Sequence, residues 1–160
     1  MQNKIRRYNL FALLCLLVSL GWIWLTKVSP GSSAYAAQPI PRKSFAAPDF
    51  ILPAPDGAVY NLQDLRGRPV IINFWASWCP PCRAEMPALE RVYAEYQEDG
   101  LIVLAVNTTN QDDLQAALDF AASLNLTFPI LLDEIGDVSS LYQRQAMPTT
   151  FFVDAQGIIQ

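Results

Sequence analysis

A short apolar run that leads directly into a pair of cysteines constrains the fold most. Residues 70–75 read VIINFW, a stretch without charge that is typical of a strand buried on both faces of a sheet. The run WCPPC follows at residues 78–82, and an amphipathic helical pattern extends from Pro81 to Gln97. A central strand therefore places Cys79 and Cys82 at the N-terminus of a helix.

Strands and helices alternate along the rest of the chain. Before the central strand, two extended segments flank the turn signal Asp56-Gly57 and predict a β-hairpin. After it, strand patterns cover residues 101–106, 128–132 and 149–153, and helix patterns cover residues 112–124 and 137–145. This order predicts one α/β domain built on a parallel sheet.

The helix predicted from Pro81 has one apolar face. Pro87 is expected to break or kink it near its start, and Gly100 is expected to end it. Residues three and four apart predict the core face: Met86, Leu89, Val92, Tyr93 and Tyr96.

Residues 1–27 have the pattern of a signal-anchor or signal peptide. Basic residues near the start precede residues 10–25, which carry no charge. That run is short for a membrane span, which needs about 20 apolar residues, yet long for the apolar part of a cleaved signal. Trp22 and Trp24 favour a retained anchor, whereas the sequence AYA at residues 34–36 offers a cleavage site, so both interpretations remain open.

Residues 28–44 are rich in Pro, Ser and Ala and predict a flexible linker, so the folded domain spans residues 45–160. By the positive-inside rule this domain faces the periplasm or the cell exterior, either on a single-pass membrane anchor or secreted after cleavage. Outside the first 36 residues, seven basic residues stand against fifteen acidic ones. A domain of that charge repels phosphate backbones, which excludes nucleic acid as a partner.

Cys79 and Cys82 have the spacing of a redox-active pair. A thiolate is the nucleophile in disulfide exchange, and the N-terminus of a helix favours that negative charge. Cys79 is therefore expected to attack, and Cys82, one turn further on, to resolve the mixed disulfide. The pair itself carries two electrons, and no cofactor is expected.

Two other uses of paired cysteines fit less well. A zinc site needs three or four ligands, whereas the chain has no histidine and its third cysteine, Cys15, lies in the apolar run. A structural disulfide across so short a loop would contribute little loop-closure entropy. No metal ligands are predicted.

Four stretches resemble the TlpA-like (ResA-type) family of membrane-anchored thiol-disulfide oxidoreductases, in the thioredoxin superfamily. They are residues 47–57 (APDFILPAPDG), 65–67 (LRG), 73–87 (NFWASWCPPCRAEMP) and 147–151 (MPTTF). The resemblance implies a thioredoxin-like fold with an N-terminal β-hairpin and an inserted helix-strand unit. It also implies that the protein reduces disulfides in client proteins, for example in cytochrome c or copper-site maturation, and that an upstream membrane thiol reductant restores the pair.

The resemblance implies roles for further residues. Pro148 would be cis and face the dithiol, the Met147 backbone would pair with a client strand, and Trp78 would belong to the client-facing surface. Glu85 matches a proton acceptor for the resolving cysteine, with a solvated surface glutamate as the alternative. Many thioredoxins carry an aspartate at the position of Asn73, so this chain lacks that base.

Two other functions are kept as alternatives. A peroxiredoxin-type peroxide reductase shares the APDF opening, but it needs a hydroxyl three residues before its nucleophile and a proline further back. This chain has Ala76 and Ile72 at those positions. A copper metallochaperone of this superfamily adds a distant histidine to its cysteines, and this sequence has none.

The domain is expected to stop before the last strand and covering helix of such a fold. The strand from Thr149 would then approach a sheet edge, and Phe151 or Phe152 would lose cover.

Overall fold

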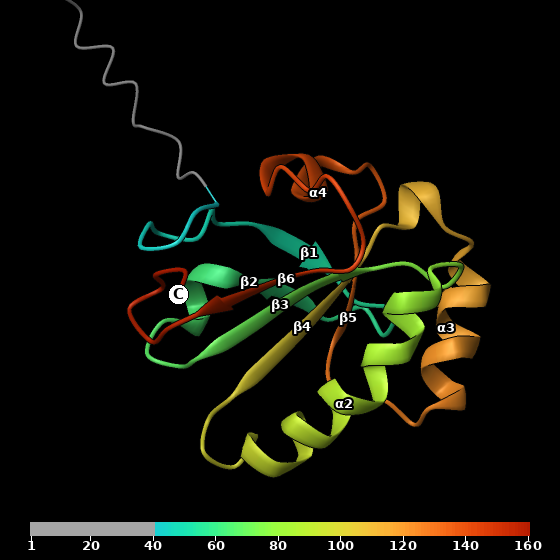
Figure 1. Cartoon of the computed structure of the whole chain (residues 1–160), viewed down its shortest axis with the longest axis horizontal. Coiled ribbons are helices and arrows are strands. Elements are labelled where there is room, and N and C mark those ends of the chain that lie inside the picture. Colours follow the sequence, from blue (N-terminus) through green and yellow to red (C-terminus); the bar gives the residue numbers. More distant parts are fainter. Residues whose placement is uncertain (1–40) are drawn as a thin grey trace, which may run out of the picture. The chain divides into compact units, whose positions relative to one another are not determined.

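The computed structural model describes residues 41–160 (Figure 1). The signal-anchor or signal peptide predicted for residues 1–27 and most of the linker predicted for residues 28–44 lie outside the described residues and stay predictions. Within residues 41–160, no helix combines the length and the apolar character that a membrane crossing requires.

Four strands form the central sheet, in the order β5-β4-β3-β6. β3 (Val70–Trp75) pairs in parallel with β4 (Ile102–Asn107), and β4 pairs in parallel with β5 (Ile130–Leu132). β6 (Thr149–Val153) runs antiparallel beside β3. The strand predicted to be central therefore has a neighbour on each side.

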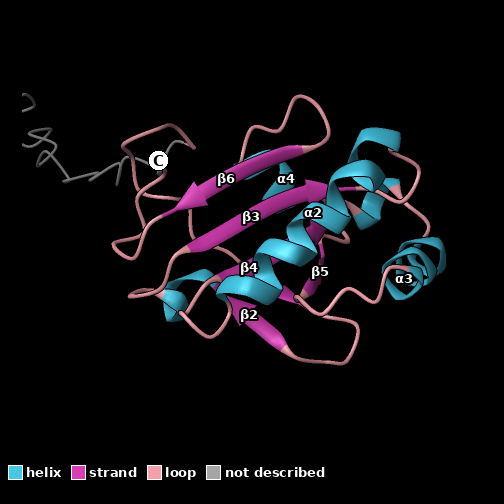
Figure 2. Ribbon diagram, turned by 60° about the horizontal axis from the view of Figure 1, so that its bottom comes forward, coloured by secondary structure: helices cyan, strands magenta, loops and turns pink. Residues whose placement is uncertain are grey.

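A β-hairpin and several helical segments surround this sheet. β1 (Ile51–Pro53) and β2 (Val59–Asn61) pair antiparallel, as the turn signal predicted. Figure 2 shows the longest helix, α2, lying across one face of the sheet. The described helical segments are η1 (Leu62–Leu65), α2 (Pro80–Tyr96), η2 (Thr109–Gln111), α3 (Leu114–Ser123) and α4 (Asp137–Leu141).

β3 is buried along its whole length, and its side chains alternate between the two faces of the sheet. Ile72 packs in a cluster with Leu52 of the hairpin and Val138 of α4. Trp75 packs in a second cluster with Met86 of α2 and residues of α3. The sheet thus separates a layer formed by the hairpin and α4 from a layer formed by α2 and α3.

Tyr142 ties the segment before the hairpin to the first cluster. Its hydroxyl donates to the Pro48 carbonyl oxygen at 2.7 Å, and its ring centre lies 5.0 Å from that of Phe151 and 5.3 Å from that of Phe74. Burial, with a smaller effect from the charge of Asp49, raises the pKa of the Tyr142 phenol. The hydroxyl therefore remains a neutral donor to the backbone.

α2 differs from its prediction in two respects. Pro87 does not break it, because the packing of this helix on the sheet outweighs the one backbone hydrogen bond that proline removes, while the kink expected as the other outcome stays a prediction. Val92 and Tyr96 are 37% and 45% exposed, so their assignment to the core face was wrong. They line an open apolar groove with Leu101 and Phe152, since the last turns of α2 lie over a part of the sheet that no other described helix covers.

β6 forms an edge of the described sheet, as expected for the strand from Thr149. The turn that follows it leads to Ile159, which bridges to Val153, and the Gln160 N–H donates to the Phe152 carbonyl at 2.9 Å. Phe152 is 56% exposed, whereas Phe151 is half-buried against the ring of Tyr142. Of the two phenylalanines expected to lose cover, Phe152 does so.

Candidate functional site

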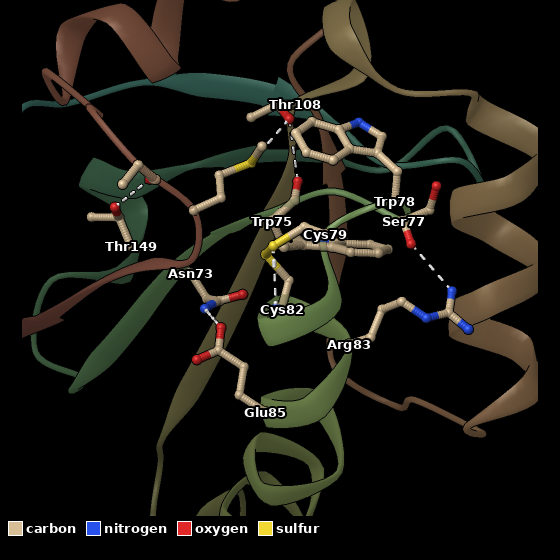
Figure 3. Close-up of a disulfide and its surroundings, with 12 residues drawn as sticks. Asn73, Trp75, Ser77, Trp78, Cys79, Cys82, Arg83, Glu85, Thr108 and Thr149 are labelled. Carbon is tan, nitrogen blue, oxygen red and sulfur yellow. Dashed lines mark hydrogen bonds between the residues drawn. A yellow bond between two sulfur atoms is a disulfide. The ribbon is translucent and has the colours of Figure 1, made fainter.

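The chain leaves β3 at Trp75 and enters α2 through a cysteine (Figure 3). Cys79 is the N-cap of α2: its backbone is extended (φ −88°, ψ 107°), and its sulfur accepts the Cys82 N–H at 3.3 Å. Pro80 and Pro81 occupy the first helical turn, where a backbone N–H has no partner within the helix. The local sequence therefore sets both cysteines at the start of α2.

Cys79 and Cys82 form a disulfide, with their Cα atoms 5.3 Å apart. Both side chains belong to the apolar cluster between the sheet and α2. Cys82 is fully buried, whereas Cys79 keeps 3% of its surface exposed next to Trp78, which is 57% exposed. Of the two cysteines, Cys79 therefore lies nearer the surface.

The loop before β6 lies against this disulfide. Met147 packs in the same apolar cluster as the two cysteines, and the Met147–Pro148 peptide bond is cis, as the resemblance implied. Thr108, directly after β4, donates through Oγ1 to the Trp75 carbonyl at 3.3 Å and to Met147 Sδ at 3.6 Å. The structure thus packs Met147 with the cysteine pair, and Pro148 follows it across the cis bond.

Glu85 lies one turn after Cys82 on α2 and is half-buried. Its Oε1 accepts a hydrogen bond from Asn73 Nδ2 at 2.7 Å, and the same nitrogen donates to Thr150 Oγ1 at 3.0 Å. Asn73 itself is fully buried in β3. The Glu85 carboxylate is therefore held against a buried amide on the Cys82 side of the helix, unlike a freely solvated surface glutamate.

The loop between β3 and α2 is held by a carboxylate that sequence reasoning did not single out. Asp112 accepts the backbone N–H and the hydroxyl of Ser77, each at 2.6 Å, and the side-chain amide of Asn107 at 2.8 Å. The indole N–H of Trp78 donates to the Gln111 carbonyl at 2.8 Å. These bonds fix the direction in which the chain approaches the first cysteine.

Arg83 is a second residue that the sequence analysis missed. Its guanidinium carbon lies 4.1 Å from the centre of the Phe120 ring, and its Nη1 donates to the Ser77 carbonyl at 3.2 Å. The position of Asp112 could have been recognised from the sequence. It follows β4, and the loop with the cysteines follows β3; because these strands are parallel, both segments lie at the same edge of the sheet. No sequence pattern identifies the contacts of Arg83, because its partners are Phe120 of α3 and Ser77 of the loop.

The site offers a disulfide at the start of a helix, apolar walls and a carboxylate one turn after Cys82. Within residues 41–160, no three His, Cys, Asp or Glu side chains are grouped so as to hold a metal ion. The chemistry that this arrangement supports is two-electron exchange between thiols and disulfides.

Comparison with known proteins agrees with this geometry. The sequence model of the AhpC/TSA family matches residues 45–160. The chain belongs to this family. It is similar to the thioredoxin-like protein YneN of Bacillus subtilis, 45% identical over 115 residues that cover 71% of this chain and 66% of the relative. It is also similar to the thiol-disulfide oxidoreductase ResA of Oceanobacillus iheyensis, 42% identical over 124 residues that cover 74% of this chain and 63% of the relative.

The chain thus spans just under two thirds of the length of these two relatives. Among solved structures, it is similar to a secreted Mycobacterium tuberculosis disulfide oxidoreductase homologous to E. coli DsbE. The TM-score is 0.63 with 30% sequence identity, over 69% of this chain and 80% of that chain. The thioredoxin-like fold and the similarity to ResA-type proteins, both expected from the sequence motifs, are confirmed.

Replacing Asp112 with alanine is expected to loosen the loop before the first cysteine. Because Ser77 and Asn107 lose a charged acceptor, the free energy of unfolding should fall by about 1.5–3 kcal/mol, and amide exchange at Ser77 should accelerate. Urea denaturation and hydrogen exchange measure these changes. Glu134→Ala, at an exposed position, is the control and should leave both unchanged. Wild-type values for Asp112→Ala would show that the loop does not depend on this carboxylate.

Proposed function

We propose that this protein is a thiol-disulfide oxidoreductase that reduces disulfides in client proteins outside the cytoplasm. The observation that carries the proposal is the disulfide between Cys79 and Cys82 at the first turn of α2, with Cys79 nearer the surface and next to the exposed Trp78. The similar proteins named thiol-disulfide oxidoreductase and disulfide oxidoreductase support the same chemistry.

The proposed cycle starts from the reduced pair. The Cys79 thiolate attacks one sulfur of a client disulfide, so a mixed disulfide forms and the other client sulfur leaves as a thiolate. Cys82 then passes its proton to Glu85, and its sulfur attacks Cys79, which closes the Cys79–Cys82 disulfide and releases the second client thiolate. Two electrons have moved from the protein to the client. An upstream membrane thiol reductant restores the pair by the reverse exchange.

Two features support Cys79 as the attacking sulfur. Its Sγ already accepts the Cys82 N–H, and the free N–H groups and dipole at the start of α2 stabilise a thiolate there. It is also the less deeply buried cysteine of the pair. Cys82 is fully buried, which suits a resolving cysteine because client disulfides cannot reach it directly.

Clients are proposed to dock on the surface formed by Trp78, Met147 and Pro148. Trp78 offers an exposed ring, the other two residues are half-buried, and Met147 packs in the apolar cluster of the disulfide. The backbone of Met147 would pair with an extended client segment by strand addition. A client is thus an extended, partly apolar segment that carries a disulfide, and proteins in cytochrome c or copper-site maturation are candidates of this class.

Peroxide reduction, the main alternative, has less support. Ala76 lies three residues before Cys79, is fully buried, and offers a methyl group where peroxide chemistry would need a hydroxyl. Its carbonyl accepts the Cys79 N–H at 3.2 Å. The copper metallochaperone alternative lacks the expected histidine anywhere in the sequence.

Exchanging the two cysteines separately tests the proposal. Cys79→Ser removes the attacking sulfur, so insulin reduction driven by dithiothreitol should be lost. Cys82→Ser leaves the attack intact but blocks resolution, so mixed disulfides with clients should accumulate on nonreducing gels. Cys15→Ser, outside the pair, is the matched control and should act like wild type. Insulin turnover by the Cys79 variant, or peroxide turnover by the wild type in place of insulin turnover, would contradict the proposal.

Glu85→Gln tests the proton acceptor. Glutamine keeps an oxygen that can accept from Asn73 but cannot take a proton from Cys82, so resolution of a mixed disulfide should slow on the order of a hundredfold. Stopped-flow single turnovers measure this step. Glu95→Gln, at an exposed position on the same helix, is the control. Equal rates in both variants would show that another group, or water, takes the proton.

We also propose that residues 1–27 anchor the domain on the outer face of the cell membrane. The support is the charge-free run at residues 10–25 and the basic residues before it. In bacteria that express the full chain, the protein should sediment with membranes, and protease added to intact spheroplasts should degrade it. Resistance to that protease until the cells are lysed would contradict the proposal, and a soluble periplasmic form would indicate cleavage.

A further inference from the structure

Asn73 carries a buried polar atom without a partner in the oxidised protein. The residue lies within β3 on the α2 side of the sheet and is fully buried. Its Nδ2 donates to Glu85 Oε1 at 2.7 Å and to Thr150 Oγ1 at 3.0 Å, which uses both of its hydrogens. Its Oδ1 has no hydrogen-bond donor among residues 41–160. Because buried acceptors without a donor are rare in native proteins, this atom points to a donor that arises in another state.

The orientation of the Asn73 amide follows from its partner. An ionised carboxylate only accepts hydrogen bonds, so Glu85 requires the nitrogen of the amide on its side. The oxygen therefore lies on the other side, and Figure 3 shows it directed toward Cys82. In the disulfide, the sulfur of Cys82 carries no hydrogen and cannot donate.

We propose that Asn73 is the positioning residue of the resolving cysteine: in the reduced protein its Oδ1 accepts a hydrogen bond from the Cys82 thiol, while its Nδ2 keeps its bond to Glu85. This role deepens the proposed thiol-disulfide exchange and rests on it.

Reduction supplies the missing donor. A dithiol reductant gives up two electrons and two protons and becomes a disulfide, the Cys79–Cys82 bond breaks, and Cys82 Sγ gains the hydrogen that Asn73 Oδ1 accepts. When Cys82 later resolves a mixed disulfide, that proton passes to the Glu85 carboxylate and Sγ bonds to Cys79. The amide holds the thiol at one end and the carboxylate at the other, and it neither gains nor loses a proton itself.

This hydrogen bond has a predictable effect on the redox equilibrium. It exists only in the reduced state, whereas the oxidised state leaves the buried Oδ1 unpaired, so Asn73 stabilises the dithiol relative to the disulfide. Removing the acceptor should therefore make the disulfide harder to reduce.

Asn73→Leu replaces the amide with carbon atoms of similar volume. When the full chain is equilibrated with glutathione or dithiothreitol buffers, the disulfide of this variant should be about tenfold harder to reduce than that of wild type, equivalent to a potential about 30 mV more negative. Thr150→Val is the matched control: it removes the other partner of Nδ2 but keeps Oδ1, and its equilibrium should equal that of wild type. Urea unfolding should show that Asn73→Leu weakens the reduced protein more than the oxidised one.

If the redox equilibrium of Asn73→Leu equals that of wild type and both redox forms are destabilised equally, Asn73 contributes only to packing. That result would overturn the inference. An equal shift of the redox equilibrium in Asn73→Leu and Thr150→Val would also overturn it. Infrared spectroscopy of the Cys15→Ser, Cys79→Ser double variant needs no change at Asn73, because Cys82 is then the only thiol in the chain. A lowered S–H stretching frequency supports the hydrogen bond, and the frequency of a free thiol overturns it.

These readouts need no client. If wild type fails to reduce insulin but Asn73→Leu still shifts the equilibrium, the proposed function fails, whereas the hydrogen bond from the Cys82 thiol to Asn73 stands. If wild type reduces insulin and the equilibrium does not shift, the function stands and the role of Asn73 fails.

Discussion

The burial of β3 on both faces is the constraint on which the rest of the structure depends. Every residue from Val70 to Trp75 is buried, with β4 paired on one side and β6 on the other. A shift of the strand by one residue would exchange its two faces, sending the amide of Asn73 into the apolar cluster around Leu52. Because a change of register is so costly, the end of β3 at Trp75 has a fixed position in the sheet. The loop that follows therefore delivers Cys79 to the N-terminus of α2.

Two polar side chains near this strand, Asp112 and Asn73, differ in what they bind. Asp112 satisfies the backbone N–H and hydroxyl of Ser77, so the loop before the cysteines keeps one conformation. Asn73 is different, because an amide inside an apolar strand is unfavourable unless it is bonded. Its bonds to Glu85 and Thr150 offset part of that cost, and its free oxygen faces the cysteine pair.

Much of this fold could be predicted from local patterns. The residues of β3, the hairpin turn and the ends of α2 within one residue follow from side-chain periodicity, glycine and proline, which act through neighbouring residues. The assignment of Val92 and Tyr96 to the core failed for the same reason: periodicity shows that a helix has an apolar face but not how far along the helix the sheet extends.

The sequence by itself determined the chemistry of the pair, because the N-cap position of Cys79, the prolines of the first turn and the spacing to Cys82 are all set within one turn of helix. Only the tertiary structure decided the surroundings of that pair. Asn73 meets Glu85 from 12 residues away and Thr150 from 77 residues away, because α2 packs on one face of β3 and β6 pairs along its edge. Burial and hydrogen bonding at the inner sulfur depend on atoms from distant segments, and no local pattern specifies them.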